Sequence, residues 1–98
     1  MSVRYVKAFN ADLGELSLNL ESGDLWKRFT ANRVTKVQVG TTTKKFLFRT
    51  KQVERLEIYA EGETEPYVIE QGRFKDDYAW AKEVLQKFCE KNKIKYAS

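Results

Sequence analysis

Residues 67–92 read YVIEQGRFKDDYAWAKEVLQKFCEKN, and the spacing of the apolar side chains changes within this stretch. Tyr67 and Ile69 stand two residues apart, as side chains on one face of a β-strand do. Beyond Gly72, the apolar residues instead recur every three or four positions, which is the repeat of an amphipathic helix. The sequence therefore predicts a strand that ends near Gly72 and a helix over about residues 74–92.

The predicted helix has one apolar side. At about 100° per residue, its apolar side chains fall in a single stripe with Trp80, Val84 and Cys89 along its margins. The centre of the stripe holds Phe74, Tyr78, Ala81, Leu85 and Phe88. We expect this stripe, Trp80 included, to be buried against a sheet. Asp76 and Asp77 fall in the first turn, where the helix dipole favours anions, so we interpret them as helix-start residues.

Upstream of this stretch the chain has the pattern of strands joined by short turns. Leu16, Leu18 and Leu20 alternate with polar residues, as in a strand with one buried and one exposed face. Comparable patterns predict strands over residues 3–9, 16–20, 25–29, 35–39, 45–49, 53–60 and 67–70. We expect Trp26, in the third of these strands, to lie in the core, because tryptophan is usually largely buried.

One hairpin is predicted with a definite register. A turn at residues 40–43 pairs Val37 with Phe46 and places the valines on the same face as the phenylalanines, Phe48 included. The same register places on the opposite face the polar side chains of Lys36, Gln38, Lys45 and Arg49.

Together these elements predict an α+β fold. The chain has 98 residues, a length typical of one domain, so we expect residues 1–98 to form a single domain. Strands over about residues 3–70 followed by one helix indicate an antiparallel sheet, or a small barrel, of six to seven strands with a C-terminal amphipathic helix.

A family resemblance is carried by residues 14–16 (GEL), 25–29 (LWKRF) and 67–69 (YVI). The first two segments resemble the first strand and the aromatic-basic second strand of pleckstrin-homology-like (PH-like) domains. The third, followed by a polar turn and a helix with Trp80, is similar to their last strand and tryptophan-bearing helix. The resemblance implies a PH-like fold and a protein partner. It does not imply the family's lipid site, which uses a lysine in the first strand and a lysine-x-arginine pair in the second. Here the strand around Leu16 has no lysine, and Lys27 and Arg28 are adjacent, so their side chains point to opposite sides of the strand.

Charge is distributed unevenly along the chain, although the net charge is only +4. The segment from residue 54 to residue 70 holds six glutamates and one arginine. The segment from residue 27 to residue 51 has no acidic residue and eight basic ones, Lys27, Arg28, Arg33, Lys36, Lys44, Lys45, Arg49 and Lys51. A basic hairpin beside aromatic residues is typical of a phosphate-binding surface, but lysines also protect the edges of sheets from aggregation.

The composition restricts the chemistry. The chain has no histidine, which excludes a Ser-His-Asp or Cys-His pair and every histidine-bearing metal site. The single cysteine, Cys89, lies on the apolar side of the predicted helix, so we interpret it as a structural thiol. We therefore expect no enzymatic activity, no metal and no cofactor.

The single cysteine also suits a reducing compartment. The sequence shows no signal peptide and no apolar run of the roughly 20 residues that a membrane-spanning helix needs. We therefore expect a cytoplasmic protein.

Two functional hypotheses follow. In the first, the protein is a binding module that holds nucleic acid or another polyanion through the eight basic residues. In the second, it is a PH-like adaptor or inhibitor that binds a protein partner or, less readily, an anionic membrane surface. Fold class does not choose between them.

Overall fold

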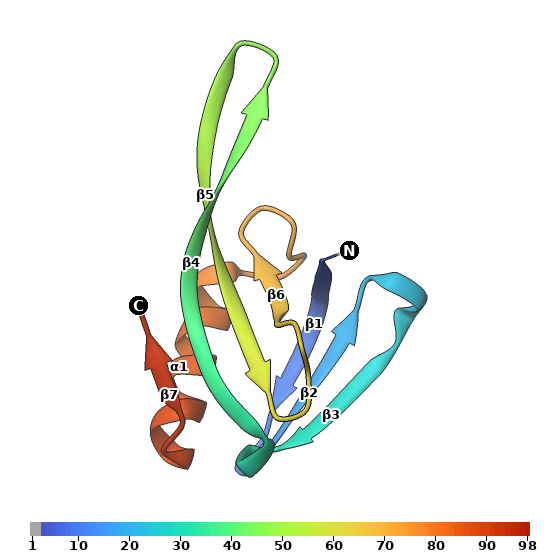
Figure 1. The fold of residues 1–98 in the computed structure, drawn as a ribbon, viewed down its shortest axis with the longest axis vertical. Coiled ribbons are helices and arrows are strands. Elements are labelled where there is room, and N and C mark those ends of the chain that lie inside the picture. The colour runs from blue at the N-terminus through green and yellow to red at the C-terminus, as the bar shows by residue number, and fades with distance from the viewer. Residues whose placement is uncertain (1–2) are drawn as a thin grey trace.

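The computed structural model describes residues 3–98, apart from the side chains of Asp24 and Phe46. One helix packs against a sheet (Figure 1). The helix is α1 (Tyr78–Asn92), and the strands are β1 (Arg4–Ala11), β2 (Glu15–Leu20), β3 (Trp26–Thr30), β4 (Val34–Phe46), β5 (Arg49–Ala60), β6 (Tyr67–Glu70) and β7 (Lys95–Ala97). The short 3-10 helices η1 (Ser22–Asp24) and η2 (Ala31–Arg33) flank β3.

The sheet has seven strands in the order β3-β2-β1-β6-β5-β4-β7. This confirms the α+β class, but the prediction of a purely antiparallel sheet is wrong. β1 and β6 run parallel, with Tyr5 opposite Val68, and β4 and β7 run parallel, with Val37 opposite Tyr96. The sheet is also not a closed barrel, since β3 and β7 form its two edges.

β7 was not predicted, because three residues are too few to show a pattern. It exists because α1 ends at a residue in the left-handed conformation, Lys93 (φ 56°). The backbone N–H of Ile94 then donates to the carbonyl of Cys89, which closes the last turn of the helix. The chain reverses there and runs beside β4.

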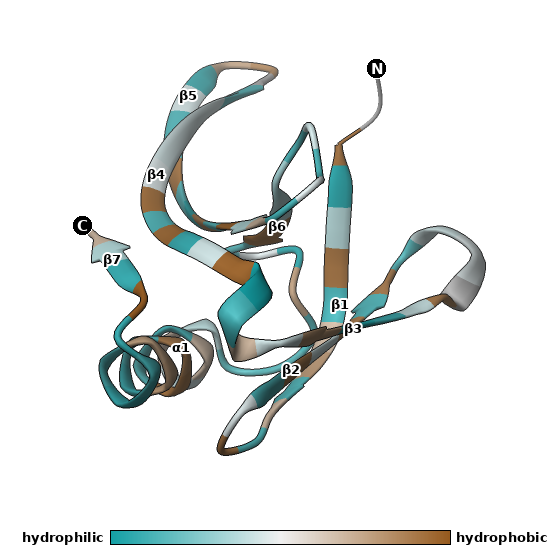
Figure 2. Cartoon of the chain, turned by 60° about the horizontal axis from the view of Figure 1, so that its bottom comes forward, coloured by the Kyte–Doolittle hydropathy of each residue, from teal (hydrophilic) through white to brown (hydrophobic). Residues whose placement is uncertain are grey.

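The core lies between the sheet and α1. Its fully buried side chains come from both layers and include Leu16, Leu56, Ile58, Tyr67 and Leu85. Figure 2 shows the apolar side of α1 turned toward the sheet and the hydrophilic side turned away. The predicted stripe is confirmed at its buried helical members, Ala81, Leu85, Phe88 and Cys89. No helix in the described part of the chain is long and apolar enough to cross a membrane.

α1 begins four residues later than predicted. Asp77 has extended backbone angles and caps the helix, since its carboxylate accepts a hydrogen bond from the backbone N–H of Ala79 at 3.0 Å. Phe74 is nevertheless buried, at the end of the turn that follows β6. Asp77 therefore stabilises the start of the helix as its cap, but the prediction that Asp76 and Asp77 lie in the first turn is wrong, since both precede Tyr78.

The predicted turn at residues 40–43 is wrong. β4 continues straight through these residues to Phe46, the chain turns at Leu47 and Phe48, and β5 returns along β4. Val37 consequently lies opposite Ile58 rather than Phe46. The three threonines after Gly40 are β-branched and favour a strand over a turn. Phe48 is 94% exposed at the tip of this hairpin, and the predicted orientation of the Phe46 side chain lies outside the described part.

Both tryptophans are more exposed than predicted. Trp26 is 56% exposed on β3, an edge strand whose buried residue is Phe29. Trp80 is 46% exposed at the margin of the helix stripe, where its ring lies 5.4 Å from that of Phe9.

Candidate functional site: the arm of the β4–β5 hairpin

The outer part of the β4–β5 hairpin projects from the body of the protein (Figure 1). β6 pairs with β5 only over Arg55–Ile58, and β7 pairs with β4 only over Lys36–Gln38. Within the part of the chain that the structure describes, residues 42–53 therefore pair with each other and with no further strand. We call this segment the arm. Five residues of extended β4, residues 42–46, give it a length of about 16 Å at roughly 3.3 Å per residue.

The register assigns the side chains of the arm to two faces. Thr43 lies opposite Gln52, and Lys45 opposite Thr50. Because neighbouring side chains in a strand point to opposite faces, these four share one face. The other face carries the cationic side chains of Lys44, Arg49 and Lys51.

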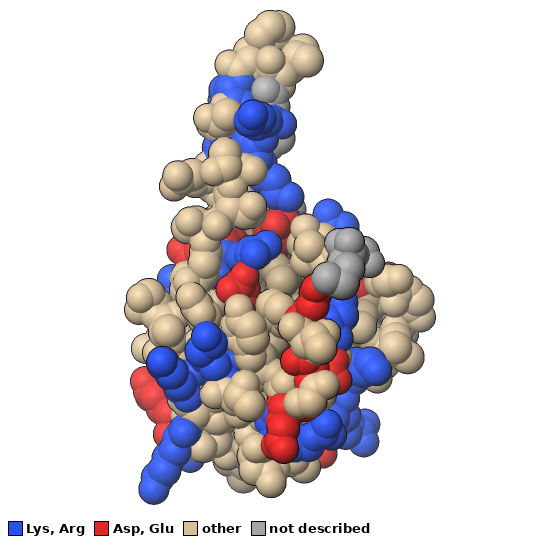
Figure 3. Space-filling view, viewed as in Figure 1, with Lys and Arg blue, Asp and Glu red and all other residues tan. Residues whose placement is uncertain are grey.

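The arm is strongly basic. It contains Lys44, Lys45, Arg49 and Lys51 and no acidic residue. Figure 3 shows the basic side chains gathered along it below the tip. Among residues 3–98, no acidic side chain forms an ion pair with Lys45, Arg49 or Lys51. These three side chains are exposed, so their charges are available to an anionic ligand.

Lys44 has a different environment. Its Nζ lies 3.0 Å from Oε2 of Glu70, a carboxylate that is only 4% exposed. A hollow of ≈ 390 Å³ at the base of the arm is lined by both residues together with Lys51, Val53 and Arg73. Lys44 therefore ties the arm to β6 in addition to contributing charge.

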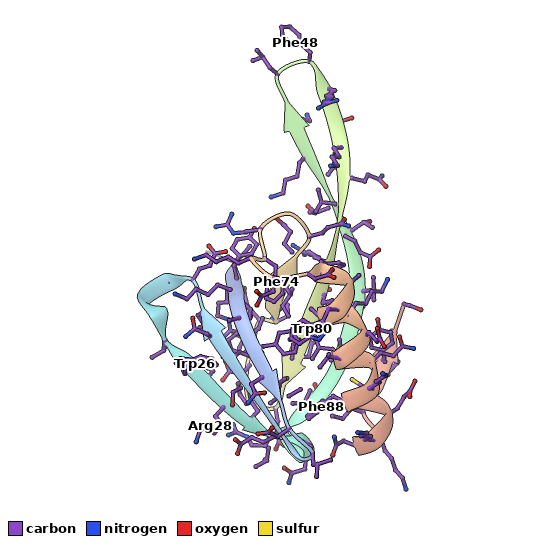
Figure 4. The ribbon with its side chains drawn as sticks, turned by 180° about the vertical axis from the view of Figure 1, so that it is seen from behind. Trp26, Arg28, Phe48, Phe74, Trp80 and Phe88 are labelled. Carbon is purple, nitrogen blue, oxygen red and sulfur yellow. The ribbon has the colours of Figure 1, made fainter. Side chains whose placement is uncertain are left out.

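The tip of the arm is apolar. Leu47 is 89% exposed and Phe48 is 94% exposed. Figure 4 shows Phe48 at the far end of the hairpin, directed away from the body. The prediction that Phe48 shares a face with the valines is therefore wrong, since Val37 is fully buried. The run Phe46-Leu47-Phe48 could have indicated this, because three successive apolar residues break the alternation that a half-buried strand requires.

The other four predicted site residues lie away from the arm. Lys27 and Arg28 are on β3, at the edge of the sheet, where Nε of Arg28 lies 3.5 Å from a carboxylate oxygen of Glu15. Arg33 is in η2, with its guanidinium 5.6 Å from the centre of the Phe29 ring. The eight predicted residues do not form one surface, since the structure brings only half of them together.

Lys36 also lies in the body of the protein. Its Nζ is 4.6 Å from the centre of the Tyr59 ring, and along β4 it is about 26 Å from Lys44 at roughly 3.3 Å per residue. The register further places Lys45 on the face opposite to Arg49. The prediction that Lys36, Lys45 and Arg49 share one face is therefore wrong.

A second exposed surface lies on β3. Leu25 and Trp26 are 51% and 56% exposed, and the two basic residues that follow are exposed as well. In Figure 4, Trp26 lies far from Phe48, so this surface and the tip of the arm are separate. The sequence predicted Trp26 to be buried and therefore missed it.

Two side chains of α1, those of Cys89 and Tyr78, have raised pKa values. Burial raises the pKa of the Cys89 thiol to about 11, and its side chain is 1% exposed, which fits the structural role predicted for it. Burial likewise raises the pKa of Tyr78, helped by the nearby carboxylate of Glu54. Within residues 3–98, no three His, Cys, Asp or Glu side chains are grouped as ligands of a metal ion.

A comparison of the chain with known protein families, with curated proteins and with solved structures found no match. The PH-like resemblance therefore stays a prediction.

Proposed function

We propose that this protein is a non-enzymatic binding module that holds nucleic acid with its arm. The observation that carries the proposal is the combination, on one projecting hairpin, of an exposed apolar tip with three exposed cations that form no ion pair with the described residues. Cations on a projecting element attract the phosphate backbone. We place this function in the cytoplasm, the setting predicted from the single cysteine.

The tip argues against a purely protective role for the lysines. Lysines that keep sheet edges apart act by making an edge unattractive to other chains. An exposed Leu47-Phe48 pair at the same place has the opposite effect, since exposed apolar groups promote association. A binding role accounts for both the basic sides and the apolar tip.

Charge reversal on the arm tests the proposal. We expect the triple variant Lys45→Glu, Arg49→Glu and Lys51→Glu to bind a short labelled oligonucleotide at least about 100-fold more weakly near 50 mM salt, where phosphate contacts are strong. The logarithmic dependence of affinity on salt should flatten by roughly 0.7 to 0.9 for each phosphate that the variant no longer neutralises. Fluorescence anisotropy across a salt series measures both quantities. Lys44 is left unchanged in this variant because of its contact with Glu70.

The matched control reverses three exposed lysines outside the arm, Lys75, Lys91 and Lys95. The two variants have the same net charge, so a diffuse attraction would weaken equally in both. We expect the control to lose only a few-fold in affinity. Equal losses would contradict an arm site, and failure of the unmodified protein to bind at about 50 mM salt would contradict the proposed function.

A second candidate function has its own observation. β3 is an edge strand that begins with the exposed Trp26 and follows directly on the exposed Leu25. Edge strands can accept a further strand from a partner. This supports an adaptor or inhibitor that binds a protein, as the PH-like resemblance implies. A protein partner that copurifies from the native source should then be lost with Trp26→Ser and retained with the arm variant.

A further inference from the structure

The turn at the end of the arm lacks the residues that two-residue hairpin turns usually contain. Two-residue hairpin loops favour glycine or asparagine, because the turns that match strand twist need positive φ at one or both positions. Leu47 and Phe48 occupy these positions, and neither has positive φ. A turn with negative φ at both positions splays the two strands. The pair is therefore unfavourable for the turn and exposed to water, which points to a role in contact with a ligand.

The shape of the arm indicates what kind of nucleic acid fits. Proteins that hold single strands do so in a positively charged groove lined with aromatic platforms. Here the basic element projects from the body, so it can enter a groove but does not form one. The major groove of B-form DNA is about 12 Å wide and admits a two-stranded β-ribbon, and some proteins place β-strands in the minor groove instead. The corresponding groove of double-stranded RNA is deep and narrow and does not admit side chains.

The distribution of polar groups favours duplex DNA over an anionic membrane. Cations occupy both faces of the arm, with Lys45 on one and Arg49 and Lys51 on the other. A groove has phosphates on both sides of an inserted ribbon, whereas a membrane presents its charge in one plane. Thr43, Thr50 and Gln52 beside Lys45 add hydroxyl and amide groups, which suit base edges and phosphates but not the interior of a lipid layer.

We propose that the arm lies in a groove of duplex DNA and that Leu47 and Phe48 wedge between base pairs and kink the helix. This inference rests on the proposed function. In proteins that bind the minor groove, apolar wedges partly unstack a base step and bend DNA by about 20–90°. Unstacking is easiest at flexible pyrimidine–purine steps and hardest in stiff A-tracts. The arm should therefore prefer DNA that contains a TA step, although it makes no base-specific contact there.

The test uses the double variant Leu47→Ser and Phe48→Ser in the full chain. Both side chains are almost fully exposed, so the variant should keep the fold. The probe is a duplex of roughly 30 base pairs, a length over which a 40–90° bend is measurable. It carries a central TA step, donor and acceptor dyes at its ends, and 2-aminopurine beside the step. A second duplex replaces the TA step with an A-tract.

We expect the unmodified protein to raise both energy transfer and 2-aminopurine fluorescence on the TA duplex, and to bind the A-tract duplex more weakly. The tip variant should still bind, with an unchanged salt slope and roughly tenfold lower affinity, the scale of one base stacked on an aromatic ring. It should raise neither signal. Phe48→Trp, which keeps a large aromatic ring, should retain both.

Four results would overturn the inference. If the tip variant bends DNA as much as the unmodified protein does, the wedge is wrong while the proposed function stands. Tighter binding to single-stranded DNA than to the duplex would contradict the placement of the arm in a groove of duplex DNA. Tighter binding to phosphatidylserine vesicles than to the duplex would show that Leu47 and Phe48 contact a membrane, which contradicts the DNA wedge. If neither protein binds any oligonucleotide, the proposed function fails and this inference fails with it.

Discussion

Lys44 differs from the other cations of the arm because its ammonium group is paired with a buried carboxylate. Oε1 of Glu70 has no hydrogen-bond partner within residues 3–98, so the carboxylate depends on Lys44. We expect Lys44→Met to lower the free energy of unfolding by about 1–3 kcal/mol, the cost of leaving a buried acceptor unpaired. Urea unfolding measures the change.

Lys45→Met is the matched control, since this neighbouring lysine has no ion pair in the described part of the chain. Its unfolding free energy should change by less than about 0.5 kcal/mol. Glu70→Gln should recover part of the loss in the Lys44→Met background, because it removes the unpaired charge. Equal midpoints for Lys44→Met and Lys45→Met would show that Glu70 does not need the lysine.

At the scale of a single element, the buried and exposed sides of α1 should contribute differently to stability. Leu85 is fully buried, whereas the side chain of Glu83 is 66% exposed and pairs with Lys87 one turn away. We expect Leu85→Ala to cost about 2–5 kcal/mol of unfolding free energy, as deletions in packed cores do. Glu83→Ala should cost less than about 0.5 kcal/mol. Thermal or denaturant unfolding measures both, and similar costs would contradict the observed phase of the helix.

The β4–β5 hairpin shows why a strand can be predicted correctly from the sequence while the strand that it pairs with is predicted wrongly. Val37 faces the core whether it lies opposite Phe46, as predicted, or opposite Ile58, as observed. The alternation along β4 is the same in both registers, so it does not identify the partner strand. The observed register is more stable than the predicted one because it pairs Val37 and Val39 with Ile58 and Leu56, which are both fully buried. It therefore buries more apolar surface than pairing with the exposed end of the hairpin would.

At the scale of the whole molecule, sheet and helix share one core. Phe74, Leu85 and Phe88 are buried in the same cluster as Leu56 and Ile58 of the sheet. A chain truncated before Phe74 would expose that sheet surface and would also lose β7, so we expect it to show no cooperative thermal transition. Circular dichroism during heating measures this. A truncated chain with the same midpoint as the full chain would show that α1 is an appendage.

Features that depend on neighbours along the chain can be read from the sequence. The period of two in β2 and the helical period around Leu85 each arise within a few residues. The leucines of β2 and Leu85 are buried as predicted. The exposed second face predicted for β2 is wrong, since Asn19 is only 3% exposed. The basic character of the arm was equally visible, because it is a property of composition.

Features that depend on distant segments emerged only in the folded chain. The parallel pairs β1–β6 and β4–β7 join segments that are far apart in the sequence, and no local pattern encodes such a pairing. The exposure of Trp26 and Phe48 depends in the same way on which strand is an edge and where a hairpin turns. The spacing of apolar side chains is a local property, whereas burial depends on which elements pack together. For this reason the candidate site is a projecting arm rather than the predicted face of a hairpin.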